Sequence, residues 1–111
     1  VSRFPLADGR FAQIAGFCMV FDPARTAQVT QNDGSVTTAG SRVRQVKLAD
    51  GTPVVADGAV IDGPAVAIAT NDFSARGGDQ YPFRGLPFTT LGRTYQQTLF
   101  DYVSTDLGGV I

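Results

Sequence analysis

One stretch of the chain, Ala65–Tyr81, constrains the fold more than any other. It begins as a short apolar run, residues 65–69, and changes at Thr70 to a polar loop that contains the pair Gly77-Gly78. A short run of small and branched apolar residues is typical of a strand buried on both faces. A glycine pair lets the backbone adopt positive φ or approach another group closely. The stretch therefore predicts a buried central strand ending in a loop suited to carrying a site.

The segments before this stretch predict a mostly antiparallel sheet. Phe11–Phe21 is apolar on both faces, so we expect a strand inside a layered structure rather than at an exposed edge. Ser41–Ala49 is expected to be the return strand, and the turn dipeptide at residues 50–51 joins it to a short strand at Thr52–Val55. Pro53 favours an edge position for that short strand, because proline cannot donate to a ladder.

The remaining segments predict a connection and a helix. Residues 24–40 are rich in polar residues and glycine, which predicts an extended, partly mobile hairpin connection. Thr94 and Gln97 have the spacing of a capping box, and the glycines at 108–109 provide a stop signal. Apolar side chains at helical spacing are expected to face a core. They are Tyr95, Leu99, Tyr102 and Val103.

Composition limits the classes of partner. The chain has 111 residues, 43% apolar and 17% charged, with a formal net charge of −1. Its nine Lys and Arg are spread along the sequence, which argues against a nucleic-acid polymer or an anionic membrane as partner. No apolar run approaches the roughly 20 residues of a membrane span. We expect one domain over residues 1–111, N-terminally incomplete because the chain begins at Val1 without Met.

The ionisable residues predict no metal site. The chain has no histidine and one cysteine, so a His/Cys zinc site or a His-based triad cannot be built from it. Cys18 is expected to be a buried, unreactive thiol. Many of the aspartates precede glycine, a pair typical of turns, and none has the spacing of a calcium loop. These pairs begin at Asp8, Asp33, Asp50, Asp57 and Asp62.

The polar loop carries a longer pattern, TNDFSARGGDQYPF, which resembles the signature of the C-terminal domain of the 5'-nucleotidase family. That family includes UDP-sugar hydrolases and cyclic-nucleotide phosphodiesterases. The matching residues are Asn71, Phe73, Ala75, Gly77, Gly78, Asp79 and Tyr81. The chain departs from the pattern at Gln80, where glycine is usual. Two further segments, GRFAQIAGFCMVFDP from Gly9 and the Gly-Ser-Arg-Val run at residues 40–43, resemble the same family.

The resemblance implies an α+β fold, the later part of a four-layered α/β/β/α domain with a mostly antiparallel sheet and a C-terminal helix. It implies a substrate-specificity domain of a periplasmic or secreted metal-dependent phosphoesterase. In this family a separate N-terminal domain holds two divalent metal ions and hydrolyses the phosphate ester with a metal-activated water. By this resemblance the chain alone is expected to be inactive, with a nucleotide or nucleoside and that N-terminal domain as its partners.

The same resemblance implies the site residues. Phe73 matches one of two aromatic residues that stack on the nucleobase; the other lies upstream of the part corresponding to Val1. Asp79 matches the carboxylate that accepts hydrogen bonds from the ribose hydroxyls, a charge-assisted interaction. Asn71 is expected to shape the loop, and Gly77 and Gly78 to let it pass close to the ligand or simply to turn it.

Other interpretations of these residues stay open. Phe73 can be an ordinary core aromatic, and Asp79 can cap neighbouring backbone N–H groups. Arg76 is expected to be a solvated surface residue rather than a phosphate ligand. The chain can also be a non-catalytic binding or interaction module that keeps the fold without using nucleotides. A domain cut in this way would expose apolar surface, which predicts self-association.

Overall fold

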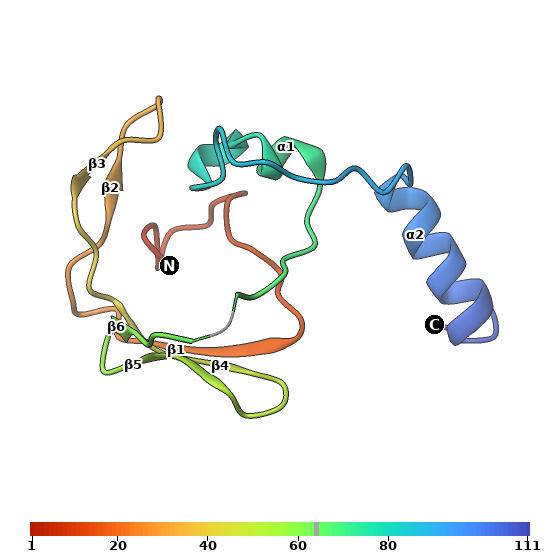
Figure 1. Cartoon of the computed structure of the whole chain (residues 1–111), viewed down its shortest axis with the longest axis horizontal. Coiled ribbons are helices and arrows are strands. Elements are labelled where there is room, and N and C mark those ends of the chain that lie inside the picture. The colour runs from red at the N-terminus through yellow and green to blue at the C-terminus, as the bar shows by residue number, and fades with distance from the viewer. Residues whose placement is uncertain (64) are drawn as a thin grey trace. The chain divides into compact units, whose positions relative to one another are not determined.

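The computed structural model describes residues 1–63 and 65–111, and their contacts divide the chain into two compact units, Val1–Ile68 and Ala69–Ile111 (Figure 1). Among the described residues, the strands all lie in unit 1 and the helices all lie in unit 2. The expectation of an α+β protein with a mostly antiparallel sheet and a C-terminal helix is confirmed. The single domain expected over residues 1–111 stays a prediction.

Unit 1 is built on a four-stranded antiparallel sheet. Its strands are β1 (Phe17–Phe21), β4 (Val43–Leu48), β5 (Pro53–Ala56) and β6 (Ala59–Val60), in the order β1-β4-β5-β6. The register places Met19 opposite Val46, Val46 opposite Val55, and Val55 opposite Val60. Directly opposed residues share a face of the sheet. One row of apolar side chains therefore crosses all four strands.

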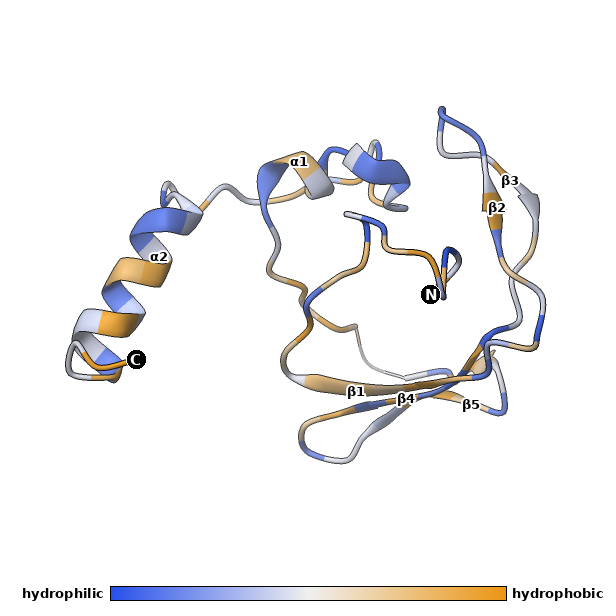
Figure 2. Ribbon diagram, turned by 180° about the vertical axis from the view of Figure 1, so that it is seen from behind, coloured by the Kyte–Doolittle hydropathy of each residue, from blue (hydrophilic) through white to orange (hydrophobic). Residues whose placement is uncertain are grey.

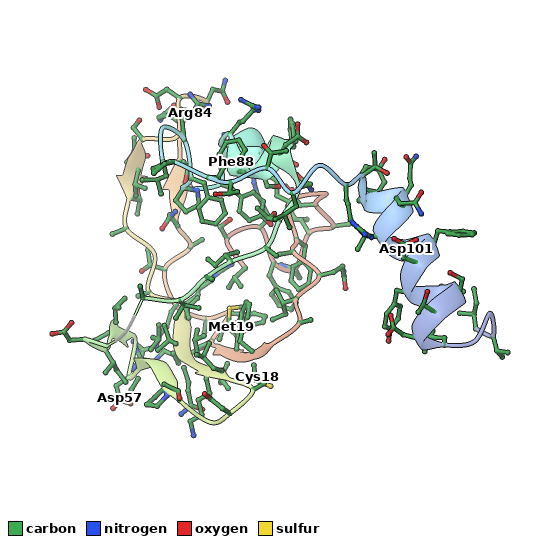
Figure 3. The ribbon with its side chains drawn as sticks, turned by 45° about the vertical axis from the view of Figure 1, so that its right-hand side comes forward. Cys18, Met19, Asp57, Arg84, Phe88 and Asp101 are labelled. Carbon is green, nitrogen blue, oxygen red and sulfur yellow. The ribbon has the colours of Figure 1, made fainter. Side chains whose placement is uncertain are left out.

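The first strand differs from its prediction in length and position. It begins at Phe17 rather than Phe11, because Gly16 has φ +81° and turns the chain out of the extended conformation. It lies at the edge of the sheet, and exposed residues alternate with half-buried ones along it. Cys18 and Met19 point to opposite sides of β1 (Figure 3). The expectations of a doubly buried strand and of a buried Cys18 thiol were wrong, because Cys18 and Val20, on the same face of β1, are both exposed.

The return strand and its turn follow the sequence closely. β4 falls within the predicted range 41–49, and the turn after it is closed by Gly51 N–H donating to the Leu48 carbonyl at 2.9 Å. Gly51 has φ +88°, a conformation that glycine adopts without strain. β5 has neighbours on both sides, so the edge position expected from Pro53 was wrong. The β5–β6 ladder starts only at Val55, which leaves Pro53 outside it.

The long connection before β4 is a hairpin, as expected. β2 (Val29–Thr30) pairs with β3 (Val36–Thr38) in a separate two-stranded sheet. Gln31 N–H donates to the Ser35 carbonyl at 2.8 Å and closes the loop between them.

Three of the Asp-Gly pairs share one turn geometry. The carboxylate of each aspartate accepts a hydrogen bond from the backbone N–H two residues ahead, and the pairs are Asp8–Arg10 at 2.9 Å, Asp33–Ser35 at 2.9 Å and Asp50–Thr52 at 2.8 Å. The bond from Thr52 holds the pKa of Asp50 below its usual value. Side-chain hydrogen bonds from Arg10 hold the pKa of Asp8 well below its usual range. The turn interpretation of these three aspartates is confirmed.

Arg42 ties the first residues to the sheet. Its Nη1 donates to the carbonyl oxygens of Val1 at 2.9 Å, Ser2 at 3.3 Å and Phe4 at 3.1 Å. Its Nε donates to the Arg25 carbonyl at 3.1 Å. One side chain next to β4 therefore fixes two segments that are distant in sequence.

Burial is the largest departure from expectation. None of the apolar side chains in the described ranges is buried. Ser74 is the one buried polar residue in these ranges. Residues 65–69, expected to form the central buried strand, form no strand and are exposed. A strand needs a ladder partner for its backbone groups, and no described strand pairs with these residues. The central-strand prediction was wrong.

The C-terminal helix begins where the sequence predicts. α2 (Tyr95–Asp101) continues into a π-helical turn, η2 (Tyr102–Asp106), and two positive-φ glycines follow at 108–109. Thr94 caps α2, its Oγ1 accepting from Gln97 N–H at 3.1 Å. The stripe expected to be core lies open: Tyr95, Leu99 and Tyr102 are exposed and Val103 is half-buried. Figure 2 shows the hydrophobic colour along this helix. In the described ranges, no helix has the length and apolar character that crossing a bilayer requires.

The cap of α2 gives a first test. Thr94→Ala should destabilise the helix by about 1 kcal/mol, because the Gln97 N–H loses its acceptor. Amide hydrogen exchange of residues 95–98 measures this loss. Thr94→Ser keeps a hydroxyl and should exchange like the unmodified chain. Equal protection in the alanine and serine variants would show that the cap contributes nothing.

Candidate functional site

The five residues predicted to form the site all lie in the first turns of unit 2. They fall on α1 (Asp72–Ala75), on the 3-10 turn η1 (Gly78–Gln80) and at the positions that join and precede them. Together they span Asn71 to Asp79, so local backbone geometry alone decides how they are presented.

Asn71 sets the start of α1. Its φ and ψ are −74° and 160°, and its Oδ1 accepts from Ser74 N–H at 2.8 Å. This is an N-cap, in which a side-chain oxygen satisfies a backbone donor that the first helical turn leaves free. Asn71 therefore shapes the loop, as its chemistry suggests.

Gly77 ends α1 and turns the chain towards η1. It has φ +86°, and its N–H donates to the Ser74 carbonyl at 2.9 Å. A Cβ atom added here would lie 2.6 Å from Arg84 Cβ and 3.1 Å from Arg84 Cα. Both the positive φ and the contact with Arg84 require glycine.

Gly78 supports the ring of Phe73. A Cβ added to Gly78 would lie 2.5–2.6 Å from three atoms of that ring, so the ring rests on the bare backbone. Phe73 is nevertheless 57% exposed, and within residues 1–63 and 65–111 no other aromatic ring pairs with it. The core interpretation of Phe73 was therefore wrong.

Asp79 and Gln80 follow with an uncommon backbone. Both have positive φ, +52° and +63°, and neither is glycine. Aspartate tolerates this left-handed region better than most residues, whereas glutamine is strained there. Asp79 is exposed, and its carboxylate has no hydrogen bond or ion pair with another described residue. The structure does not give it the loop-capping role considered above.

The next segment brings further residues to α1. The guanidinium carbon of Arg76 lies 5.2 Å from the centroid of the Phe88 ring, which is a cation–π arrangement. Arg84 and Phe88 both lie beside α1 (Figure 3). In the sequence, residues 82–92 are interrupted by two prolines and two glycines. No spacing rule indicates that Arg84 meets Gly77, so this neighbour was missed.

These features define what the site can do. An exposed aromatic face can stack on a flat ligand, and an exposed carboxylate without a partner can accept hydrogen bonds from hydroxyl groups. A pocket of about 350 Å³ lies elsewhere, in unit 1, and none of the five predicted residues lines it. Among the described residues, no three His, Cys, Asp or Glu side chains gather as metal ligands would.

Comparison of the chain with family models, with characterised proteins and with solved structures gave no match.

Proposed function

We propose that this chain is a nucleoside-recognition part of a metal-dependent phosphoesterase of the 5'-nucleotidase type. Phe73 stacks on the base and Asp79 accepts hydrogen bonds from the ribose hydroxyls, while Asn71, Gly77 and Gly78 hold the turn that presents them. The observation that carries the proposal is the exposure of the Phe73 ring on its Gly78 support, with the exposed carboxylate of Asp79 next in the chain.

The backbone at Gln80 supports the resemblance on which the proposal rests. Its φ of +63° is one that glycine adopts readily and glutamine does not. The family pattern has glycine at this place. Gly77 and Gln80 therefore both have positive φ at positions where the pattern has glycine, although this chain carries glutamine at the second.

The expected affinity is low. One stacked base contributes about 1–3 kcal/mol, and a charge-assisted hydrogen bond about 1.5–3 kcal/mol. A single exposed ring and one carboxylate thus correspond to dissociation constants of about 1 mM. A second aromatic ring, contributed from outside these residues, would enclose the base and raise the affinity.

The wider assignment belongs to the same proposal. The two units form the later part of a four-layered α/β/β/α domain of a periplasmic or secreted enzyme. Two divalent metal ions in a separate domain activate the water that hydrolyses the nucleotide phosphate ester. The chain described here supplies specificity, so it is inactive when assayed alone.

A titration with adenosine tests the proposal. Adenosine should shift the Phe73 ring resonances and the Asp79 amide saturably in NMR spectra of the full chain. Phe73→Ala and Asp79→Asn should each weaken binding at least fivefold, and Phe73→Tyr should restore it. Phe100→Ala and Asp106→Asn change exposed residues of α2 and η2 and are matched controls. Absence of any saturable shift, or equal losses in the controls, would refute nucleoside recognition.

A second candidate function has its own observation. The described apolar side chains are all at least partly exposed, including most of the α2 stripe. Exposed apolar surface on this scale favours a non-catalytic module that binds another protein. This candidate would be favoured if adenosine caused no saturable NMR shift and if a binding protein protected the amides of α2 from hydrogen exchange.

A further inference from the structure

The pocket in unit 1 has a lining unlike that of the nucleoside site. It is open to solvent, has a volume of about 350 Å³, and lies where the start of β4, the strand β5, the β5–β6 turn and β6 meet the first residues. Sites for small molecules have volumes of about 300–1,000 Å³. The pocket is therefore large enough for a small ligand, and none of its lining comes from unit 2.

One side of the pocket carries a fixed positive charge. Arg42 lines it and has the one charged side chain among the lining residues. Four backbone carbonyls hold its Nε and Nη1, and the N–H groups of its Nη2 have no hydrogen-bond partner among the described residues. A guanidinium fixed in this way loses little conformational freedom when it binds a further anionic group.

A second guanidinium, that of Arg44, lies against Gly58, which is one of the lining residues. Gly58 lines the pocket, and the space that a side chain there would occupy is taken by Arg44: a Cβ added to Gly58 would lie 3.2 Å from Arg44 Cζ. Within residues 1–63 and 65–111, neither guanidinium forms an ion pair with a carboxylate. Asp57, next to Gly58, is exposed and not within ion-pair distance of either. Arg42 therefore lines the pocket and Arg44 lies next to its lining, and neither guanidinium has a counter-ion among the described residues.

The pocket also has an apolar part, which includes three valines, Val43, Val55 and Val60. They provide apolar surface for a ligand body of a few carbons, each buried CH₂ contributing about 0.8 kcal/mol. A strongly hydrated inorganic anion would gain nothing from them. We propose that this pocket binds a small organic carboxylate, the carboxylate facing Arg42 and attracted also by the neighbouring charge of Arg44, with an aliphatic body lying on the valines.

Butyrate is a suitable probe of this pocket. In NMR titrations of the full chain, butyrate should shift the amides of Gly40, Gly58 and Val43 saturably at millimolar concentrations. Butyramide has the same body without the charge and should bind at least fivefold more weakly. Inorganic phosphate, which has charge without the body, should also bind at least fivefold more weakly. Equal shifts with either analogue, or no saturable shift with butyrate, would overturn the proposal.

Two variants locate the binding. Arg44→Gln should weaken butyrate binding at least fivefold, and Arg93→Gln, on the segment before α2, should not change it. Val60→Glu brings a carboxylate to the pocket from a residue that is 80% exposed, so it should fold and repel butyrate. Val110→Glu is the matched control at an exposed site in unit 2. Unchanged butyrate binding in Val60→Glu would place the ligand elsewhere and refute the pocket.

Discussion

Gly77→Ala is expected to disrupt the turn that joins α1 to η1. The left-handed conformation at φ +86° costs a residue with a Cβ about 1–2 kcal/mol. The new Cβ would also lie 2.6 Å from Arg84 Cβ and 3.2 Å from Arg84 N, and overpacking of this kind costs about 1–3 kcal/mol. Part of the obstruction is backbone, so it cannot be relieved by a change of rotamer. Protection of the Tyr81 amide, which donates to the Gly78 carbonyl at 3.1 Å, reports the loss.

Gly34→Ala separates the two contributions. Gly34 has a similar φ, +90°, but a Cβ added there would meet no atom within 4 Å. Gly34→Ala should therefore destabilise its turn only through the strain of positive φ. The loss of amide protection in the β2–β3 turn should be correspondingly smaller. The difference between the two variants measures the contact with Arg84. Equal losses would mean that Arg84 does not lie against Gly77.

Self-association of the chain is the second expected result. Its accessible surface is 8716 Å², whereas two separate compact globules of the sizes of units 1 and 2 would expose roughly 7,000 Å² in total. The excess is about twice the 800 Å² that each partner buries in an interface of standard size. We expect light scattering to give a molar mass at least twice the 11.7 kDa of the chain, falling on dilution.

A pair of variants on α2 locates the association. Leu99→Lys places a charge in the exposed apolar stripe and should lower the average molar mass at a given concentration. Gln96→Lys adds the same charge to the same helix outside that stripe and should leave the mass unchanged. A mass of 11.7 kDa at every concentration would show that the exposed surface needs no partner.

Short-range structure was predictable because its causes lie within a few residues. The turn after β4 and the cap at Thr94 each depend on one side chain and a backbone group two or three positions away. The sequence carries all the information that such a contact needs. The glycine signal after α2 succeeded for the same reason.

Burial was not predictable, because it depends on which other segments pack against a residue, and hydrophobic periodicity does not identify those segments. Residues 65–69 have the composition of an inner strand, yet no described strand pairs with them. Phe73 was weighed as a core aromatic and is exposed on Gly78. The contact between the Phe73 ring and Gly78 depends on the conformation of the turn between them, which the sequence alone does not give. The approach of Arg84 to Gly77 was likewise not visible in the sequence, because the two residues meet only through the path of the chain between them.

The way in which Arg42 holds the first residues has a consequence for mutational tolerance. All four of its hydrogen bonds end on carbonyl oxygens, and every amino acid supplies the same carbonyl. Substitutions at positions 1, 2 and 25 should therefore leave the anchorage intact, whereas a change at position 42 should release both segments at once. In a deep mutational scan, position 42 would therefore tolerate few substitutions, whereas positions 1, 2 and 25 would tolerate many.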